Sequence, residues 1–406
     1  MSGVTGVQAL APLRGSTGRL GIRSGLSTSP DRHLVRAATP LVLLLAVGGS
    51  LRGAAWLAHR PALCLPGEDR YIDLARSLTP DPDRLLGYAL FLRVVSPARS
   101  LGVVTLLQHV MGLGLLIGVY VFLRRRGVRT GLAALACLPL AADAYLIEVE
   151  QHLGPEVLAL ALLGLALGLL LWRRWPGYGS LATAGGLLAV ASLTVVAVLP
   201  VILLAIGHVV NRRRGWTRVA ALGLGFAVVM GGYAAYDYAA TGRLGSAHAQ
   251  LRPARVTAAP TLSDLVSDVM GVVAGDVSRY VVPGRDAAAK GGLATYDLRS
   301  RPARHWEDPA LASRLREYRS VGHIPGAVLA LCLLVTLILV ARPPGTIRVA
   351  RADVDALLLV LTGVSVAVMG AVTAPAFDYR QGLALVVLLP VAAALALGAR
   401  MSPAQR

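Results

Sequence analysis

Long apolar runs alternate with short polar segments along this chain, and arginines cluster at the ends of many of the runs. Several runs are about 20 residues long, the length that an α-helix needs to cross a bilayer core of roughly 30 Å. The pattern predicts an all-α polytopic membrane protein with about ten hydrophobic segments. Because arginine clusters mark the cytoplasmic ends of membrane helices, alternate loops are expected outside and both termini in the cytoplasm.

Loops of unequal length separate the expected segments. A loop at 60–100 follows the first segment on the outside, and a longer outer loop at 241–323 precedes the last three. The run at 180–210 has basic clusters at both ends, so it is expected to form two short helices with a turn between Leu193 and Pro200. The expected segments are 34–58, 101–123, 131–144, 155–171, 180–210 (two helices), 219–240, 324–340, 354–373 and 383–397.

Composition agrees with a protein of the membrane. Of the 406 residues, 55% are hydrophobic, the mean hydropathy is +0.63 and the formal net charge is +18. In a soluble domain this charge would suggest nucleic acid as a partner, but here it sets the orientation of helices, so no nucleic acid is expected. Cys64, Cys137 and Cys332 are odd in number and lack metal-ligand spacing, so they predict neither a disulfide framework nor a zinc site.

The two ends of the chain are polar. Residues 1–33 are rich in Gly, Ser, Thr and Arg without an apolar core or cleavage pattern, so a disordered cytoplasmic tail is expected rather than a signal peptide. Residues 400–406 are expected to form a second cytoplasmic tail. Residues 34–399 are expected to form a single transmembrane domain in the plasma (inner) membrane. Arg52, near one end of the first segment, is expected to snorkel to the interface.

The loop at 60–100 concentrates charge in a chain of which only 15% of residues are charged. Read as a helix, it places Asp69, Asp73 and Arg76 at i, i+4 and i+7 on one face. Ile72 and Ala75 fall on another face, which is expected to rest against the membrane surface.

The carboxylates of this loop are candidates for catalysis. Glu68, Asp69 and Asp73 could supply a general base that takes a proton from an acceptor hydroxyl. An ordinary solvated loop accounts for the same residues and stays open as the alternative.

A second acid-rich segment is expected outside, after the third hydrophobic run. It contains Glu148, Glu150, His152 and Glu156, in which the pairs 148/152 and 152/156 have i, i+4 spacing. These side chains could complete the site or bind a divalent metal. Polar caps at a hairpin tip are the alternative, because a Gly-Pro pair at 154–155 breaks the helix that the spacing assumes.

Other polar side chains lie at or within the hydrophobic segments. Arg380, beside Tyr379, could hold a phosphate through its forked donors, or it could be a snorkelling arginine at the interface. Gln108 and His109 lie inside an apolar segment, where hydrogen bonding between helices is the favoured interpretation.

Several motifs, in this order, resemble a known family. They resemble bacterial, especially actinobacterial, membrane glycosyltransferases of the GT-C fold related to protein O-mannosyltransferases and aminoarabinose transferases, over most of residues 34–399. The motifs are GEDRYIDLARSL at 67–78, GYALFL at 87–92, LLQHVMGLGLLIGVYVFLRRRGV at 106–128, Asp143-Ala144-Tyr145 with Glu150 and Glu156, YAAYDYAATGRLG at 233–245, REYRSVGHIPG at 316–326 and DYRQGLALVVLLPVAAALALG at 378–398.

The resemblance implies a GT-C-like domain that transfers a hexose or pentose with inversion. The donor would be a polyprenyl-phosphate sugar in the membrane, and the acceptor a glycan, lipid or protein of the cell envelope on the extracytoplasmic face. The family's base corresponds to Asp69, with Glu68 beside it and Asp73 in support. The expected donor or acceptor site comprises Glu150, His152, Glu156, Arg243, Tyr379 and Arg380, with the two arginines at the donor phosphate.

Two other functions stay open. This chain has Val195 where many relatives carry an arginine, so a non-catalytic GT-C-like scaffold is one alternative. A transporter or flippase of lipid-linked glycan is the other. It predicts charged or polar residues near the middle of several spans, but the spans contain few beyond Gln108 and His109, which favours the enzyme. No cofactor is required by these hypotheses, and a divalent metal stays open.

Overall fold

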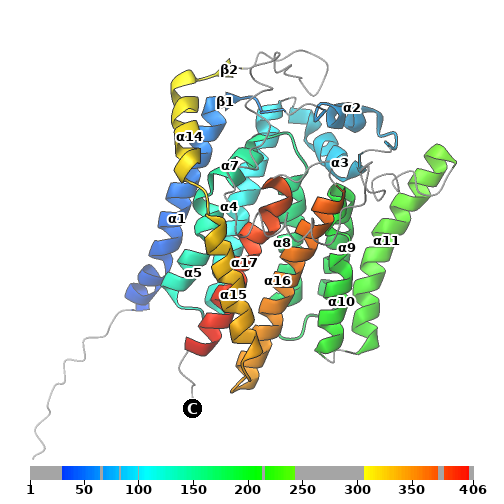
Figure 1. Cartoon of the computed structure of the whole chain (residues 1–406). Helices are drawn as coiled ribbons and strands as arrows, with labels where there is room; N and C mark the ends of the chain where they lie inside the picture. The colour runs from blue at the N-terminus through cyan, green and yellow to red at the C-terminus, as the bar shows by residue number, and fades with distance from the viewer. Residues whose placement is uncertain are drawn as a thin grey trace, which may run out of the picture.

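The computed structural model describes residues 30–64, 67–81, 84–98, 100–212, 215–242, 306–373 and 379–401, and these form a helical bundle (Figure 1). The helices are α1 (Pro30–Ala58), α2 (Arg70–Ser77), α3 (Leu86–Val95), α4 (Leu101–Arg125), α5 (Thr130–Ala136), α6 (Leu138–Ala142), α7 (Ala144–Gln151), α8 (Glu156–Trp172), α9 (Tyr178–Thr194), α10 (Val201–Asn211), α11 (Trp216–Thr241), α14 (Pro309–Val321), α15 (Gly326–Ala341), α16 (Ile347–Thr373) and α17 (Tyr379–Met401). Single 3₁₀ turns lie at Ser96–Ala98 and Val196–Val198, and the short strand β1 (His59–Arg60) pairs antiparallel with β2 (Trp306–Glu307).

Long apolar helices confirm the prediction of an all-α membrane protein. Among the described residues, five helices are long and apolar enough to cross a membrane: Ala38–Ala58 within α1, α4, α11, α16 and α17. The pair α14 and α15, which is bent by 43°, gives a sixth span if it counts as one. Shorter apolar helices, α3, α8, α9 and α10, complete the bundle, so the count of about ten hydrophobic segments stays a prediction.

Most expected segments correspond to observed helices. Those at 34–58, 101–123 and 155–171 correspond to α1, α4 and α8, and the last three correspond to α15, α16 and α17. A single helix at 131–144 is wrong: the chain forms two short helices, α5 and α6, with a break at Cys137. Helix α1 already begins at Pro30, inside the segment expected to be a tail.

The run at 180–210 divides into two helices, as its basic ends predict. Helix α9 ends at Thr194, and α10 begins at Val201 after a 3₁₀ turn. Val195 has an extended backbone, with φ −138° and ψ 115°. Pro200 directly precedes α10, where its missing N–H leaves no helical hydrogen bond unmade. The expected turn between Leu193 and Pro200 is therefore confirmed.

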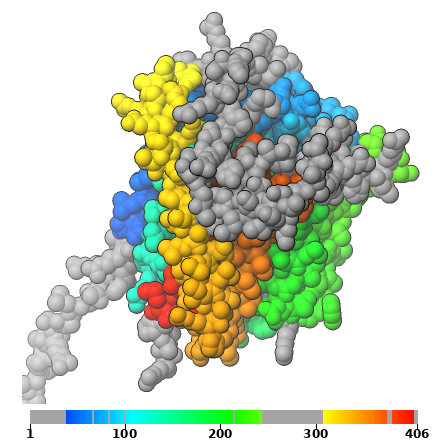
Figure 2. Space-filling view, in the orientation of Figure 1, coloured from blue at the N-terminus to red at the C-terminus, as the bar shows by residue number. Residues whose placement is uncertain are grey.

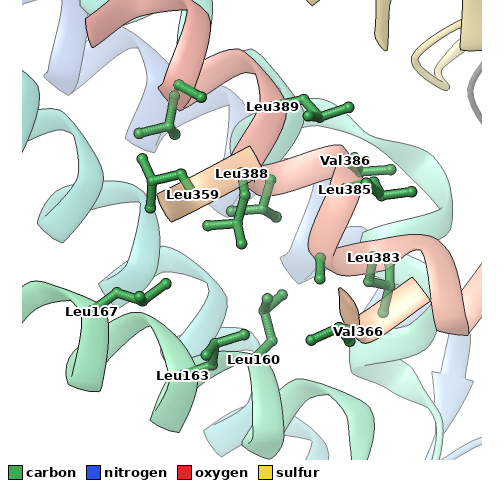
Figure 3. Packing of buried hydrophobic residues seen from close by; sticks show 14 of the residues in the cluster. Leu160, Leu163, Leu167, Leu359, Val366, Leu383, Leu385, Val386, Leu388 and Leu389 are labelled. Carbon is green, nitrogen blue, oxygen red and sulfur yellow. The ribbon is translucent and has the colours of Figure 1, made fainter. Parts of the chain in front are cut away.

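The main hydrophobic core surrounds α17. Leucines and alanines occupy nearly every side of this helix, and most of its residues are buried. A helix that is apolar all round is stable only where other apolar surface covers it. Here α16, α15 and α8 supply that surface. Figure 3 shows Leu388 of α17 near Leu359 of α16 and Leu383 near Val366, with Leu163 of α8 on the facing side.

A smaller core lies at the upper end of the bundle in Figure 1, where α2 packs on α3. Ile72 and Ala75 of α2 are buried there, together with Leu92 of α3 and Val104 of α4. The expectation that Ile72 and Ala75 rest on the membrane surface is wrong, because α3 and α4 cover this face of α2 with protein.

Apolar side chains also cover much of the outer surface of the helices. Leu331 and Leu334 of α15 and Leu224 of α11 are among the exposed large hydrophobic residues. Figure 2 shows α15 and α16 side by side along one face of the molecule, with the green helices of residues 201–241 at its edge. Such extensive exposed apolar surface indicates a lipid environment.

Helix α11 joins the bundle mainly along α9. A Cβ added at Gly185 of α9 would lie 2.0 Å from the carbonyl oxygen of Leu222, and one added at Gly225 of α11 would lie 1.9 Å from that of Ala182. The two backbones therefore meet directly, as they do where small residues line interfaces between membrane helices. Of the residues of α11, only Leu222 and Asp237 are buried.

Candidate functional site

Four polar side chains meet at the upper end of the bundle: Glu68, His152, Glu156 and Arg380, here called the Glu68 cluster. Nη1 of Arg380 lies 3.3 Å from Oε1 of Glu68 and 3.5 Å from Oε1 of Glu156. Nδ1 of His152 lies 3.9 Å from Oε2 of Glu68. Two carboxylates, an arginine and a histidine from four parts of the chain thus share one place.

Each member of the Glu68 cluster is held at the end of a helix. Glu68 lies in the turn before α2, after Gly67, whose φ of +87° favours glycine. Glu156 is the first residue of α8 and Arg380 the second of α17, and His152 directly follows α7. A carboxylate at the first position of α8 also gains from the positive end of the helix dipole.

The backbone between His152 and Glu156 is shaped around these side chains. The amide of Leu153 donates to the carbonyl of Leu63 at 2.9 Å, and the amide of Leu63 donates to the carbonyl of Gln151 at 3.0 Å. These two bonds attach the segment to the chain before α2. A Cβ at Gly154 would lie 2.3 Å from Oε2 of Glu156, so the carboxylate occupies the space that only glycine leaves.

His152 is the most deeply enclosed nitrogen-bearing side chain of the Glu68 cluster and is buried. Only 4% of its surface is exposed, and among the described residues neither ring nitrogen has a hydrogen-bond partner. Buried polar groups are nearly always hydrogen-bonded, so an unsatisfied imidazole beside a carboxylate is typical of a functional position.

Aromatic side chains form one wall of the cluster. The rings of Tyr71 and Tyr88 pack edge to face at 5.2 Å, and the Arg84 guanidinium lies 4.6 Å above the ring of Tyr71. Burial, followed by the charge of Glu156, raises the pKa of Tyr71 to about 12, although Arg84 acts in the opposite direction. Tyr71 is therefore a neutral wall at physiological pH.

The other acids of the first loop lie elsewhere. Asp69 is half-buried at the position before α2, without a side-chain hydrogen bond to the helix. Its charge lies near Cys64, whose pKa is raised to about 12 by burial and by the charges of Glu68 and Asp69. Asp73 is exposed and pairs with Arg76 at 3.3 Å. The structure thus brings Glu68 into the cluster, with Asp69 next to it in sequence and Asp73 turned outward.

Glu150 belongs to a second group, buried between helices. Arg52 donates from Nε to Oε2 and from Nη2 to Oε1 of Glu150, both at 2.7 Å, and Nδ1 of His109 lies 2.8 Å from the same Oε2. Arg52 is 2% exposed and Glu150 is completely buried. The expectation that Arg52 snorkels to the interface is wrong, because Glu150 offers it a partner inside the bundle.

Hydrogen bonds between helices extend this second group. Nε2 of His109 lies 2.9 Å from Oε1 of Gln151, and Nε2 of Gln108 donates to the carbonyl of His152 at 3.0 Å. Tyr88 donates to Oε1 of Gln108 at 3.3 Å. The favoured interpretation of Gln108 and His109 as hydrogen-bond partners between helices is confirmed, and Gln108 also links this group to His152 of the Glu68 cluster.

Asp143 fixes the helix that carries Arg380. Its Oδ1 accepts from the amide of Leu146 at 2.9 Å and from the hydroxyl of Tyr379 at 2.7 Å, and its Oδ2 accepts from the amide of Ile324 at 3.0 Å. Burial raises the pKa of Asp143, while these hydrogen bonds favour its charged form. Tyr379 is thus an anchor that holds the start of α17 beside α7.

The described side chains include Glu148, His152 and Glu156, which the sequence predicts as possible metal ligands. Within the described ranges, no group of three or more His, Cys, Asp or Glu side chains could hold a metal ion. Glu148, which forms an i, i+4 pair with His152 in the sequence, instead accepts hydrogen bonds from Arg319 of α14 through both its oxygens, at 2.7 and 2.8 Å. Arg243, the second expected phosphate contact, lies outside the described residues.

Sequence reasoning missed the roles of Arg52 and Asp143. An arginine inside an apolar run signals a buried partner, because an unpaired charge there costs several kcal/mol, on the order of 2.5 to 3.5 by insertion scales. An aspartate directly before a helix is a strong N-cap signal, and Asp143 caps α7 in this way.

None of the protein-family models, curated proteins or solved structures compared with this chain matches it.

Proposed function

We propose that this chain is a GT-C-like membrane glycosyltransferase of the plasma (inner) membrane, which moves a hexose or pentose from a polyprenyl-phosphate donor to a cell-envelope acceptor with inversion. One observation carries the proposal: Arg380 lies between the carboxylates of Glu68 and Glu156 at one end of an apolar bundle, with His152 buried beside them. A donor with an apolar tail and a phosphate needs this combination of lipid-facing helices and a cationic group at a membrane boundary.

The reaction needs a base and a place for the leaving phosphate. The acceptor hydroxyl attacks the anomeric carbon of the sugar, the bond from this carbon to the phosphate oxygen breaks, and its electron pair leaves with the lipid phosphate. A carboxylate takes the hydroxyl proton. Glu68 has the buried position that suits this role, and Asp69, the base that the resemblance implies, follows it in the chain.

Arg380 connects donor binding to the base. Its forked guanidinium can hold a phosphate through two donors. The same guanidinium donates to Oε1 of Glu68 at 3.3 Å, so the carboxylate and a donor phosphate would compete for it. When a donor phosphate takes over Arg380, the Glu68 carboxylate becomes available to the acceptor hydroxyl. Donor binding thus prepares the base.

Sugar transfer by the full-length protein in lipid nanodiscs tests this proposal. Radiolabelled polyprenyl-phosphate pentoses and hexoses serve as donors and a cell-envelope extract as acceptor. Glu68→Gln and Asp69→Asn are compared with Asp73→Asn, a matched control because Asp73 is exposed and paired only with Arg76 in the described structure. We expect transfer by the wild type and by Asp73→Asn, with a loss of at least 100-fold in one of the other two.

Donor binding is measured separately with Arg380→Gln. The expected result is weaker binding of the polyprenyl-phosphate sugar, with no change for a polyprenol that lacks the phosphate. A wild type that binds the donor but transfers nothing to any acceptor fraction favours the non-catalytic scaffold, with Val195 where relatives have arginine. A wild type that binds no donor contradicts the proposal.

A transporter of lipid-linked glycan is the second candidate, and the group of Arg52, Glu150 and His109 favours it. Charged side chains buried between membrane helices are typical of transport pathways. Proteoliposomes with a fluorescent lipid-linked sugar distinguish the two functions: movement between leaflets without sugar transfer favours the transporter, and transfer without such movement favours the enzyme.

A further inference from the structure

Arginines surround two adjoining cavities at the end of the bundle opposite the Glu68 cluster. This end holds the start of α16 and the end of α17 (Figure 1). The cavities measure about 550 Å³ and about 470 Å³ and share Arg174, Ile347 and Arg351 in their walls. The arginines that line one or both are Arg125, Arg126, Arg174, Arg212, Arg348 and Arg351.

Few negative charges balance these arginines. Among the described residues that line the two cavities there is no carboxylate. Asp355, behind the wall, binds Nη1 of Arg126 at 2.8 Å and also binds Arg212. Asp353 pairs instead with Arg400, at 2.6 Å. Asp355 thus pairs with two of the six cavity arginines, and a bound anion would reduce the repulsion among the six guanidinium groups.

Helix α16 adds to the positive potential. It begins at Ile347, and its first turn, with Arg348 and Arg351, lies in the cavity walls. The amide of Val349 donates to the hydroxyl of Thr346 at 3.3 Å, so the helix contributes mainly through its aligned dipoles, which in a helix of 27 residues favour an anion at this end.

The walls are also partly apolar. Ile347, Leu395 and Val354 contribute hydrocarbon surface, and Trp175 contributes an aromatic ring. A small inorganic anion would leave this surface wet. A phosphate that carries a glycerol and acyl chains would place the phosphate among the arginines and its apolar part against these side chains.

We propose that the two cavities bind the phosphate headgroup of an anionic membrane lipid. Arginines that only set the orientation of helices need to lie at the membrane boundary, and nothing requires them to gather around a cavity. Here the arginines converge on the two cavities from four places: the end of α4, the segments that follow α8 and α10, and the start of α16. Basic pockets between membrane helices are sites of this kind. The lipid would bind these segments together, because each supplies at least one arginine.

Binding of a short-chain fluorescent phosphatidylglycerol to the full-length protein in detergent tests the proposal. The variant Arg174→Gln/Arg348→Gln/Arg351→Gln removes three cavity arginines and leaves the Asp355 ion pairs intact. Because each basic residue near an anionic lipid contributes about fivefold in affinity, we expect a loss on the order of 100-fold. Arg173→Gln is the matched control, since Arg173 adjoins Arg174 but does not line either cavity; its affinity should stay within about twofold of wild type.

Two further arms identify the ligand. Short-chain phosphatidylcholine, which has no net charge, should fail to compete. Inorganic phosphate should compete far more weakly than phosphatidylglycerol; equal competition would assign the cavities to a free anion and overturn the lipid proposal. Unchanged affinity in the triple variant, or an equal loss in Arg173→Gln, would also overturn it, because either result would mean diffuse surface charge. Helical circular dichroism and size-exclusion profiles equal to wild type show that the variants are folded.

Discussion

Arg52 and Glu150, 98 positions apart in the chain, form a two-armed ion pair inside the helical bundle, with both N–O distances at 2.7 Å. Nη2 of Arg52 also donates to the carbonyl of Leu140 at 2.9 Å, so the arginine joins α1 to α6 as well as to α7. A pair of this kind costs much desolvation when it forms, but loss of one partner leaves a buried charge without compensation.

Removal of one partner should therefore destabilise the protein severely. We expect Arg52→Leu and Glu150→Gln each to lower the free energy of unfolding by about 3 to 5 kcal/mol. The measurement is denaturant or thermal unfolding in detergent. Arg316→Leu is the control: it breaks an exposed pair with Glu307 and should cost less than about 1 kcal/mol. Equal effects at the two sites would contradict a buried pair.

Gly112 makes room for this ion pair. A Cβ at this position would lie 1.9 Å from Oε1 of Glu150 and 2.9 Å from Nη2 of Arg52, so Gly112→Ala should displace the pair and cost about 2 kcal/mol or more. Gly114, on the same helix, has no atom within 4 Å of its added Cβ. Gly114→Ala should be neutral or stabilise the helix by up to about 1 kcal/mol. Parallel unfolding curves of the two variants give the comparison, and similar shifts in both would contradict the packing.

The hydroxyl of Tyr379 should stabilise the start of α17. Tyr379→Phe removes its donation to Asp143 and leaves a buried acceptor with one bond fewer, at a cost of about 1 to 3 kcal/mol in unfolding free energy. Tyr238→Phe removes an exposed hydroxyl and should change it by less than about 0.5 kcal/mol. If donor binding is measured on the same samples, Tyr379→Phe should also weaken it, because Arg380 follows directly in the helix.

Cys64 should resist alkylation at mildly alkaline pH. Burial and two nearby carboxylates raise the pKa of its thiol to about 12, so the reactive thiolate is rare below that pH. Relative to an ordinary thiol with a pKa of about 8.5, the rate with iodoacetamide at pH 8 should fall by on the order of 1,000-fold and rise with pH well beyond pH 9.

The two proteins compared both carry Cys137→Ser and Cys332→Ser, so that each has a single cysteine. The first protein keeps Cys64. The second carries Cys64→Ser and Ser313→Cys, which places its thiol on the exposed face of α14, where rapid alkylation is expected. A Cys64 thiol that reacts as fast as this exposed one would mean that the segment before α2 opens readily.

Hydrophobic pattern and charge predicted the membrane class and the break between α9 and α10. Basic clusters flank 180–210 at both ends, and this local constraint allows two short helices but excludes one span. Burial of α17 was not predictable in the same way, because an apolar helix has the same pattern whether lipid or protein covers it.

The candidate site was predictable in its residue types but only partly in its arrangement. Glu68 and Asp69 are adjacent acids, and the turn at Gly67 decides which of them faces Arg380. Glu150 and Glu156 lie near each other in the chain, but Gly154 and the end of α7 separate them into two different groups. Whether an acid joins one group or the other depends on partners that lie far away in the sequence. The spacing of residues along the chain carries no information about these partners.

The close approach of Gly185 to Leu222 and of Gly225 to Ala182 determines how α11 is attached to α9. Because nearly all of α11 outside these two contacts faces away from the protein core, its attachment to the bundle depends mainly on this interface with α9. Larger side chains at Gly185 or Gly225 would push the two helices apart. The place of α11 in the bundle thus depends on the absence of two methyl groups.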